Sequence, residues 1–277
     1  MSAVPGSDLA PHLPATQNST GARTVFITGA SSGIGAALAR HYAAQGATLG
    51  LAARRLDVLE ALVAGLPGSH YVYPLDVGNA AALASAANDF IARAGGPDVV
   101  IANAGISVGT LTQEASDNQA FRRVMETNVL GMVHTFQPFI SAMQARNNSS
   151  GRLVGIASVA GIRGLPGAGA YSASKAAAIA YLESLRVELR GDGIKVVTIA
   201  PGYIRTPMTD ANNYAMPFML EADEAAKRFA LAIAAGKSYV VIPWQMSIVA
   251  KLMRLLPNCI FDRLAAKAGR KPRNLPL

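Results

Sequence analysis

Short apolar runs alternate with longer Ala- and Leu-rich stretches of helical period along most of this 277-residue chain. The runs are continuously apolar, which is typical of strands in a sheet that is covered on both faces. Because strands alternate with helices, we expect right-handed crossovers between parallel strands. The predicted strands span residues 24–28, 48–52, 70–74, 98–103, 151–157, 195–200 and 239–242. The helices expected between them span residues 33–45, 56–66, 79–94, 121–145, 170–190 and 221–235.

This alternation predicts a single α/β domain over residues 23–243, with a doubly wound, mostly parallel seven-stranded sheet flanked by helices. Residues 1–22 are rich in Ser, Ala, Pro and Thr and are expected to form a flexible N-terminal extension that does not resemble a secretory signal. No apolar run reaches the roughly 18–20 residues of a membrane-spanning helix. The single cysteine, Cys259, excludes an internal disulfide, which favours a reducing, cytoplasmic location.

The formal net charge is +8, and most of the excess lies near the C-terminus. From Lys251 onward there are seven basic residues and one acid, Asp262, whereas the rest of the chain is nearly balanced. A balanced body argues against a nucleic-acid-binding protein. Residues 244–277 are predicted to form a basic amphipathic helical extension, whose apolar face includes Ile248, Val249, Leu252, Met253, Leu255 and Leu256.

Four arrangements are open for this C-terminal extension. Packing against the protein itself is the expected one. Basic amphipathic helices also lie on anionic membranes, so peripheral membrane contact is the main alternative and would make the protein membrane-associated. The same apolar face can instead pack on a neighbouring subunit or close over a substrate entrance.

A glycine-rich segment, TGASSGIG at residues 28–35, joins the first predicted strand to the first predicted helix. Glycine tolerates positive φ and lets a phosphate approach the backbone closely, and the helix N-terminus offers N–H groups to a pyrophosphate. The glycine spacing differs from the common G-x-G-x-x-G, and an ordinary tight strand–helix turn is the alternative. The residues expected to contact a dinucleotide here are Gly29, Ser31, Ser32, Gly33, Ile34 and Gly35.

The end of the second predicted strand indicates which dinucleotide binds. In dinucleotide-binding folds a carboxylate about 20 residues beyond the glycines takes the ribose hydroxyls. Here residues 51–55 read LAARR, with two arginines and no acid. A guanidinium can hold a 2′-phosphate in bidentate fashion, so Arg54 and Arg55 favour NADP(H) over NAD(H). The alternative is a solvated helix start whose charges only face water.

Tyr171 and Lys175 are four residues apart at the start of a predicted helix and therefore share one face. A free tyrosine has a pKa near 10, and a nearby ammonium lowers that pKa by favouring the phenolate. Such a pair can exchange a proton with an alcohol or carbonyl oxygen. Ser158, at a strand end, can hydrogen-bond the same oxygen, and the Asn128 amide can join a water chain behind the lysine. Y-x-x-x-K alone is common on exposed helices, so the hypothesis depends on the combination and its order.

In this order the motifs resemble the classical short-chain dehydrogenase/reductase family, NADP(H)-preferring type, over residues 24–242. The resemblance implies a Rossmann-like fold and direct hydride transfer between NADP(H) and a carbonyl or alcohol carbon, with no metal required. Tyr171 would be the general acid/base, Lys175 would lower its pKa and hold the nicotinamide ribose, and Ser158 would polarise the carbonyl. Asn128 would support a proton relay. Further family positions expected at the cofactor are Asp76, Val77, Asn103, Ala104, Gly105, Pro201, Gly202, Ile204 and Thr206.

The resemblance also implies a homodimer or homotetramer, joined through the helices that carry Asn128 and Tyr171. Some NADP-preferring members have a basic residue just before the second glycine, where this chain has Ser32. The grip on a 2′-phosphate would then depend on the two arginines, together with Ser31. A cofactor sensor or a peripheral membrane protein with little turnover is the alternative function, although the complete Ser–Tyr–Lys set weighs against a sensor.

Two stretches are expected to surround a small-molecule carbonyl or alcohol substrate. Residues 210–220 are rich in Met and aromatic side chains, which form an adaptable apolar surface. Ile162, Leu165 and Pro166 add to it and suggest a bulky or apolar substrate. Arg163 is the one arginine placed to hold a substrate carboxylate. The alternative is that these residues only pack a lid over the site.

Overall fold

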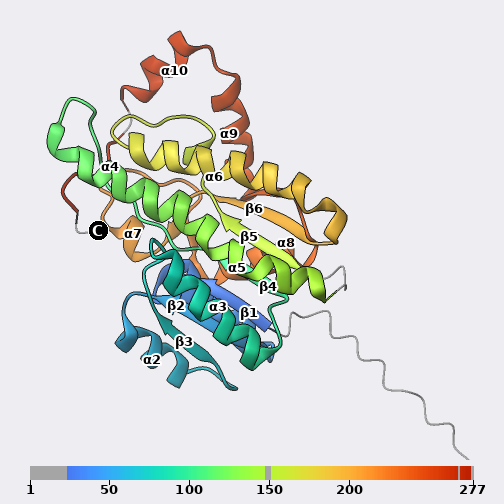
Figure 1. Cartoon of the computed structure of the whole chain (residues 1–277). Helices are drawn as coiled ribbons and strands as arrows, with labels where there is room; N and C mark the ends of the chain where they lie inside the picture. Colours follow the sequence, from blue (N-terminus) through green and yellow to red (C-terminus); the bar gives the residue numbers. More distant parts are fainter. Residues whose placement is uncertain (1–23, 147–150, 268, 276–277) are drawn as a thin grey trace, which may run out of the picture.

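The computed structural model describes residues 24–146, 151–267 and 269–275, so the predicted extension of residues 1–22 lies outside the described residues. Seven parallel strands form one sheet in the order β3-β2-β1-β4-β5-β6-β9 (Figure 1). The order reverses between β1 and β4, which confirms the prediction of a doubly wound, Rossmann-like single domain. The strands are β1 (Thr24–Thr28), β2 (Thr48–Ala53), β3 (Tyr71–Pro74), β4 (Val99–Ala102), β5 (Arg152–Ile156), β6 (Lys195–Pro201) and β9 (Tyr239–Ile242).

Helices cover both faces of the sheet. The main ones are α1 (Gly33–Ala44), α2 (Leu56–Ala64), α3 (Ala80–Ala94), α5 (Gly131–Ala145), α6 (Gly169–Glu188) and α8 (Ala222–Ala234). Alternate residues of a strand point to opposite faces, so Val25 and Ile27 of β1 pack into one core and Phe26 into the other. The first core includes residues of α1 and α8. The second includes residues of α3, α5 and α6, which lie in front of the sheet in Figure 1.

The prediction of one continuous helix over residues 121–145 is wrong. The chain forms α4 (Asn118–Met125), a π-helical segment η2 (Glu126–Leu130) and then α5. A π-helical segment widens the helix locally, and such segments are frequent at functional sites. Directly after it, a Cβ added at Gly131 would lie 2.6 Å from Val77 Cγ2, so the backbone passes close to the segment that follows β3. Asn128 lies within the π-helical segment and is 1% exposed.

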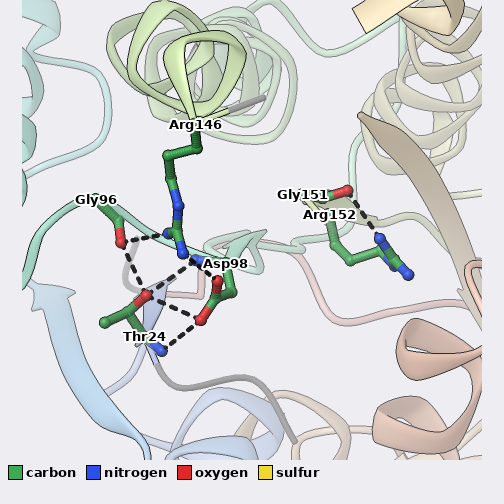
Figure 2. A network of polar contacts seen from close by, with 6 residues as sticks. All are labelled: Thr24, Gly96, Asp98, Arg146, Gly151 and Arg152. Carbon is green, nitrogen blue, oxygen red and sulfur yellow. Dashed lines mark hydrogen bonds and ion pairs between the residues drawn. The ribbon is translucent and has the colours of Figure 1, made fainter. Parts of the chain in front are cut away.

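A polar network joins the amino ends of β1 and β4 to the end of α5 (Figure 2). Asp98 accepts hydrogen bonds from the Thr24 backbone N–H at 3.0 Å and from the Thr24 hydroxyl at 3.2 Å. Arg146 pairs with the same carboxylate at 2.7 Å and donates to the Gly96 carbonyl at 2.9 Å. These charge-assisted bonds lie at the edge of the sheet opposite to the glycine loop, so they stabilise the fold without occupying the candidate site.

The C-terminal extension forms two helices, α9 (Trp244–Leu255) and α10 (Asn258–Ala265), with Pro257 between them. They lie at the top of Figure 1, above α6. α9 buries Met246 and Ala250 against the domain, and Met246 packs on Gly202. The expected packing on the protein itself therefore holds for one face of α9. No described helix is long and apolar enough to cross a membrane.

Candidate active site

The glycine loop follows β1 at the carboxyl edge of the sheet, and its positions 29 and 35 are packed too tightly for a Cβ. Gly29 has φ +66°, and a Cβ added there would lie 2.7 Å from Ala104 Cα. A Cβ added at Gly35 would lie 2.2 Å from the Gly29 carbonyl oxygen. The Asn103 amide donates to the Thr28 and Gly29 carbonyls at 3.0 and 3.1 Å. The loop is thus held against the segment after β4 and leaves the start of α1 open to the cleft.

A cleft of about 280 Å³ runs along this edge of the sheet and is lined by every predicted cofactor residue except Gly35. Gly35 instead allows the close packing of α1 on the loop. Of the predicted catalytic residues, Ser158, Tyr171 and Lys175 line the cleft, and Asn128 does not. The sequence did not single out further lining residues: Ala53, Leu75, Ile106, Thr127, Ile156, Ala157, Pro207, Met208 and Thr209.

Two arginines and an acid lie at the β2–β3 end of the cleft. Arg55 donates to the Ser31 hydroxyl at 3.2 Å, which brings the second predicted arginine onto the glycine loop. Asp76 pairs with Arg123. Partial burial favours a higher pKa for Asp76, but hydrogen bonds from Gly78 and Arg123 and the charge of Arg54 outweigh it, so the pKa lies below its ordinary value. This end of the cleft combines exposed guanidinium groups with an ionised carboxylate.

Tyr171 and Ser158 meet at the other end of the cleft. Ser158 ends the segment after β5 and caps the short helix η3 (Val159–Gly161), because its hydroxyl accepts from Ala160 N–H at 3.1 Å. Tyr171 lies in the first turn of α6 and shares a side-chain hydrogen bond with Ser158. Burial raises the pKa of Tyr171, and the bond with Ser158 opposes that rise only in part.

Lys175 lies one turn further along α6 and is 4% exposed. Its ammonium donates to the Ile156 carbonyl at 2.7 Å and lies 5.8 Å from the centroid of the Tyr171 ring. Burial lowers the pKa of Lys175 to about 8. Desolvation of the phenol dominates and raises the pKa of Tyr171, so the lowering of this pKa by Lys175 stays a prediction.

Asn128 occupies the wall behind Lys175. Its amide donates to the Ile106 carbonyl at 3.0 Å and to the Ser174 hydroxyl at 2.9 Å, and its oxygen accepts from Ile106 N–H at 2.8 Å. The Asn128 oxygen and the Lys175 ammonium both approach Gly105, where an added Cβ would lie 3.2 and 3.5 Å from them. Asn128 thus fixes the segment after β4 against α6.

Two further segments are the lid, residues 206–218, of which residues 206–209 line the cleft, and the strap, residues 269–275. The lid begins with α7 (Pro207–Asp210), which Thr206 caps. Lys271 of the strap is buried and donates to the Met208 carbonyl at 3.0 Å and to Asn212 at 3.2 Å. On the other side, Gly109 N–H donates to the Pro272 carbonyl at 2.8 Å. The strap therefore joins the lid to the segment that follows β4.

Tyr214 of the lid packs on the strap. Its Cβ would contact any Cβ added at Gly269 of the strap, at 2.3 Å, so the two segments pack directly. Burial, Tyr203 and Tyr171 together raise the pKa of Tyr214 to about 12. Tyr214 therefore lies within electrostatic reach of Tyr171 and keeps its proton at neutral pH.

Comparison with known proteins decides the family. The family model described as short chain dehydrogenase matches residues 23–216. The chain belongs to the short-chain dehydrogenase family. An uncharacterized oxidoreductase of Myxococcus xanthus is 40% identical to this short-chain dehydrogenase over 252 residues, which are 88% of this chain and 97% of the relative. Dehydrogenase/reductase SDR family member 7B of Bos taurus is 35% identical and covers 90% of this chain and 82% of its own.

Other relatives of this short-chain dehydrogenase differ in their named cofactors. A 2-dehydro-3-deoxy-L-rhamnonate dehydrogenase (NAD(+)) of Sphingomonas is 36% identical over 68% of this chain and 74% of its own. The crystal structure of a short-chain type dehydrogenase/reductase from Mycobacterium marinum has a TM-score of 0.73 and 28% identity, covering 80% of this chain and 94% of its own. The L-sorbose reductase of Gluconobacter frateurii, solved with NADPH and L-sorbose, has the same fold, with a TM-score of 0.71 and 24% identity. The match covers 80% of this chain and 95% of the reductase.

Several residues of this short-chain dehydrogenase have partners that its sequence did not predict. Arg163 does not face the cleft as a carboxylate ligand, because it donates to the Leu256 carbonyl at 2.6 Å and stacks over Phe261 at 3.9 Å. Lys271 and Arg273 were counted with the basic tail, but Lys271 is buried under the lid and Arg273 pairs with Asp117. No local pattern in the sequence marks such long-range partners.

Proposed function

We propose that this protein is an oxidoreductase that transfers a hydride between NADP(H) and a carbonyl or alcohol carbon of a small, apolar molecule. The observation that carries the proposal is a single cleft that joins the glycine loop to Ser158, Tyr171 and Lys175. The residues present fit a dinucleotide, because glycines let the loop pack closely on the segment after β4 and the start of α1 opens onto the cleft. The bound nicotinamide would supply or accept the hydride.

Tyr171 would donate or accept the proton at the substrate oxygen, as the general acid/base. A high pKa suits the acid form that reduction of a carbonyl needs at neutral pH, and burial raises this pKa. Ser158, which shares a hydrogen bond with Tyr171, would orient and polarise the same oxygen. Lys175 would hold the nicotinamide ribose, and Asn128 would position the loop at Ile106 and support a proton relay.

NADP(H) is proposed over NAD(H) because Arg54 and Arg55 line the cleft where an acid would otherwise bind the ribose hydroxyls. The hydrogen bond from Arg55 to Ser31 supports this placement, since it brings a guanidinium and a hydroxyl together where the 2′-phosphate is expected. Because one relative is named for NAD(+), binding of NADPH and NADH is the measurement that tests this proposal. We also propose that Gly35 allows α1 to pack closely on the glycine loop, and that Asp76 binds the adenine side of the cofactor.

Replacing Arg54 with Ala is expected to raise the Kd for NADPH roughly tenfold or more, since a hydrogen bond to a charged group contributes about 1.5–3 kcal/mol. The Kd for NADH should change by less than about threefold. Nucleotide fluorescence titration at one ionic strength measures both values. Arg190→Ala, which removes another exposed arginine, is the matched control. Equal losses for both nucleotides would remove the basis for NADP preference.

The substrate class is proposed from the walls around Tyr171. Met208 and Ile106 of the cleft wall are apolar, and Arg163, the arginine predicted to hold a substrate carboxylate, binds the Leu256 carbonyl instead. A homodimer or homotetramer is proposed through α4 and α6, where Phe121 and Val187 are exposed apolar side chains. No observation favours a cofactor sensor, since Ser158, Tyr171 and Lys175 are brought to one cleft.

A further inference from the structure

An apolar stripe runs along the outer side of α9. Trp244, Ile248, Leu252 and Leu255 recur at intervals of three or four residues and are 63%, 49%, 59% and 79% exposed. They lie on the side of the helix opposite to the buried Met246 and Ala250. α9 is thus apolar on two sides, of which the domain covers only one.

The following helix, α10, also exposes apolar side chains. Ile260 and Leu264 are exposed one turn apart, and Arg263 and Lys267 lie exposed beside them. The two helices are held firmly, because Arg163 binds the Leu256 carbonyl at the end of α9 and Asn258 at the start of α10. The exposed apolar residues are therefore presented by a fixed helical hairpin.

The charges on this hairpin decide between possible partners. Lys251, Arg263 and Lys267 are exposed and form no ion pair with any described residue, and Asp262 is the hairpin's one acid. A two-fold dimer through this surface would place the same patch against itself and bring these cations together. An anionic surface would instead neutralise them. The tryptophan beside the lysine also suits a membrane interface, where indole rings are enriched.

We propose that the outer surface of α9 and α10 binds peripherally to anionic membranes. The stripe of α9, with Ile260 and Leu264, would enter the boundary between headgroups and acyl chains, and the three cations would contact lipid phosphates. This inference does not depend on the proposed reaction, because the surface lies outside the cleft.

Trp244 is the chain's single tryptophan, so its emission reports directly on this surface. The full-length protein is mixed with vesicles of phosphatidylcholine and phosphatidylglycerol, and with vesicles of phosphatidylcholine alone. We expect Trp244 emission to shift to shorter wavelength and the protein to sediment with the anionic vesicles only, more weakly as salt is raised. No shift and no sedimentation with anionic vesicles would overturn the proposal.

Two sets of variants separate the apolar and the charged contributions. Leu252→Ser with Leu255→Ser is compared with Leu231→Ser, which removes a similarly exposed apolar side chain from α8. The α9 pair is expected to lower vesicle binding at least tenfold and the α8 variant less than about twofold. Unchanged NADPH binding and thermal unfolding of all variants would show that the fold is intact.

The charged set is Lys251→Gln, Arg263→Gln and Lys267→Gln, compared with Arg122→Gln, Lys227→Gln and Lys237→Gln on other exposed surfaces. Each cation near an anionic surface contributes roughly a fivefold factor, so the first triple should lose at least about tenfold in binding. Equal effects of both triples would indicate nonspecific attraction and refute the docking surface. Dissociation of an oligomer by the serine pair on α9, with no vesicle binding by the wild type, would assign the surface to a second copy instead.

Discussion

Replacing Tyr171 with Phe is expected to lower the turnover number by roughly 10²–10⁴-fold, the usual contribution of a positioned general acid or base. The change removes one hydroxyl, the group that shares a hydrogen bond with Ser158. The ring remains in the first turn of α6, so the Kd for NADPH should stay within about twofold of the wild type. Steady-state rates and nucleotide titration of the same preparation measure the two quantities.

Tyr203→Phe is the matched control, because Tyr203 is also partly buried and its ring lies 6.4 Å from that of Tyr214. This variant should keep most of the activity. A near-normal rate for Tyr171→Phe would refute the assignment of the general acid/base. If the affinity of Tyr171→Phe for NADPH falls as far as its turnover number, the hydroxyl binds the cofactor rather than the substrate oxygen.

Replacing Lys175 with Met is expected to abolish activity and yet raise the free energy of unfolding at pH 7. Burial lowers the folded pKa to about 8, whereas the unfolded value is about 10.4, so the unfolded chain binds the proton more tightly. Below pH 8 this difference costs the folded state roughly 3 kcal/mol. Losing the charge-assisted hydrogen bond to the Ile156 carbonyl costs the variant about 1.5–3 kcal/mol, which leaves a net gain of up to about 1.5 kcal/mol.

The sign of the pH dependence makes this prediction specific. Stability of the wild type should rise relative to Lys175→Met between about pH 8 and pH 10.5, as the penalty on the buried ammonium disappears. Urea unfolding at pH 7 and pH 10, at one protein concentration, measures the gap between the two proteins. The exposed Lys227→Met provides the control for removing a lysine from the surface. A constant gap for Lys175→Met would show that its pKa is not lowered in the fold.

The strands were predictable because their burial is visible in the apolar character of their own residues. Residues 24–28 and 239–242 were predicted with the bounds that β1 and β9 have, since a strand covered on both faces is apolar along its length. The glycine loop was predictable for a related reason. The tight turn against Ala104 leaves no space for a Cβ at position 29, so glycine is required there and is visible in the sequence. The candidate cleft residues followed from their order along the chain.

What remained hidden depends on contacts between distant residues. The π-helical turn at Asn128 cannot be read from a 3.6-residue period, because the same residues fit a continuous helix. The raised pKa of Tyr171 depends on its burial in the folded chain, whereas the sequence shows only the lysine nearby. Lys271 carries a surface-like charge and is nevertheless buried under Met208, a pairing of residues 63 positions apart.

The central claim is direct hydride transfer, and isotope transfer tests it most directly. The wild type is incubated with NADPH that carries deuterium at the nicotinamide C4, together with a panel of apolar ketones and aldehydes. Product alcohols are then examined by mass spectrometry and NMR. The account predicts one deuterium on the new carbinol carbon, from a single face of the nicotinamide. Oxidation of NADPH that yields a reduced product without deuterium at that carbon would contradict it.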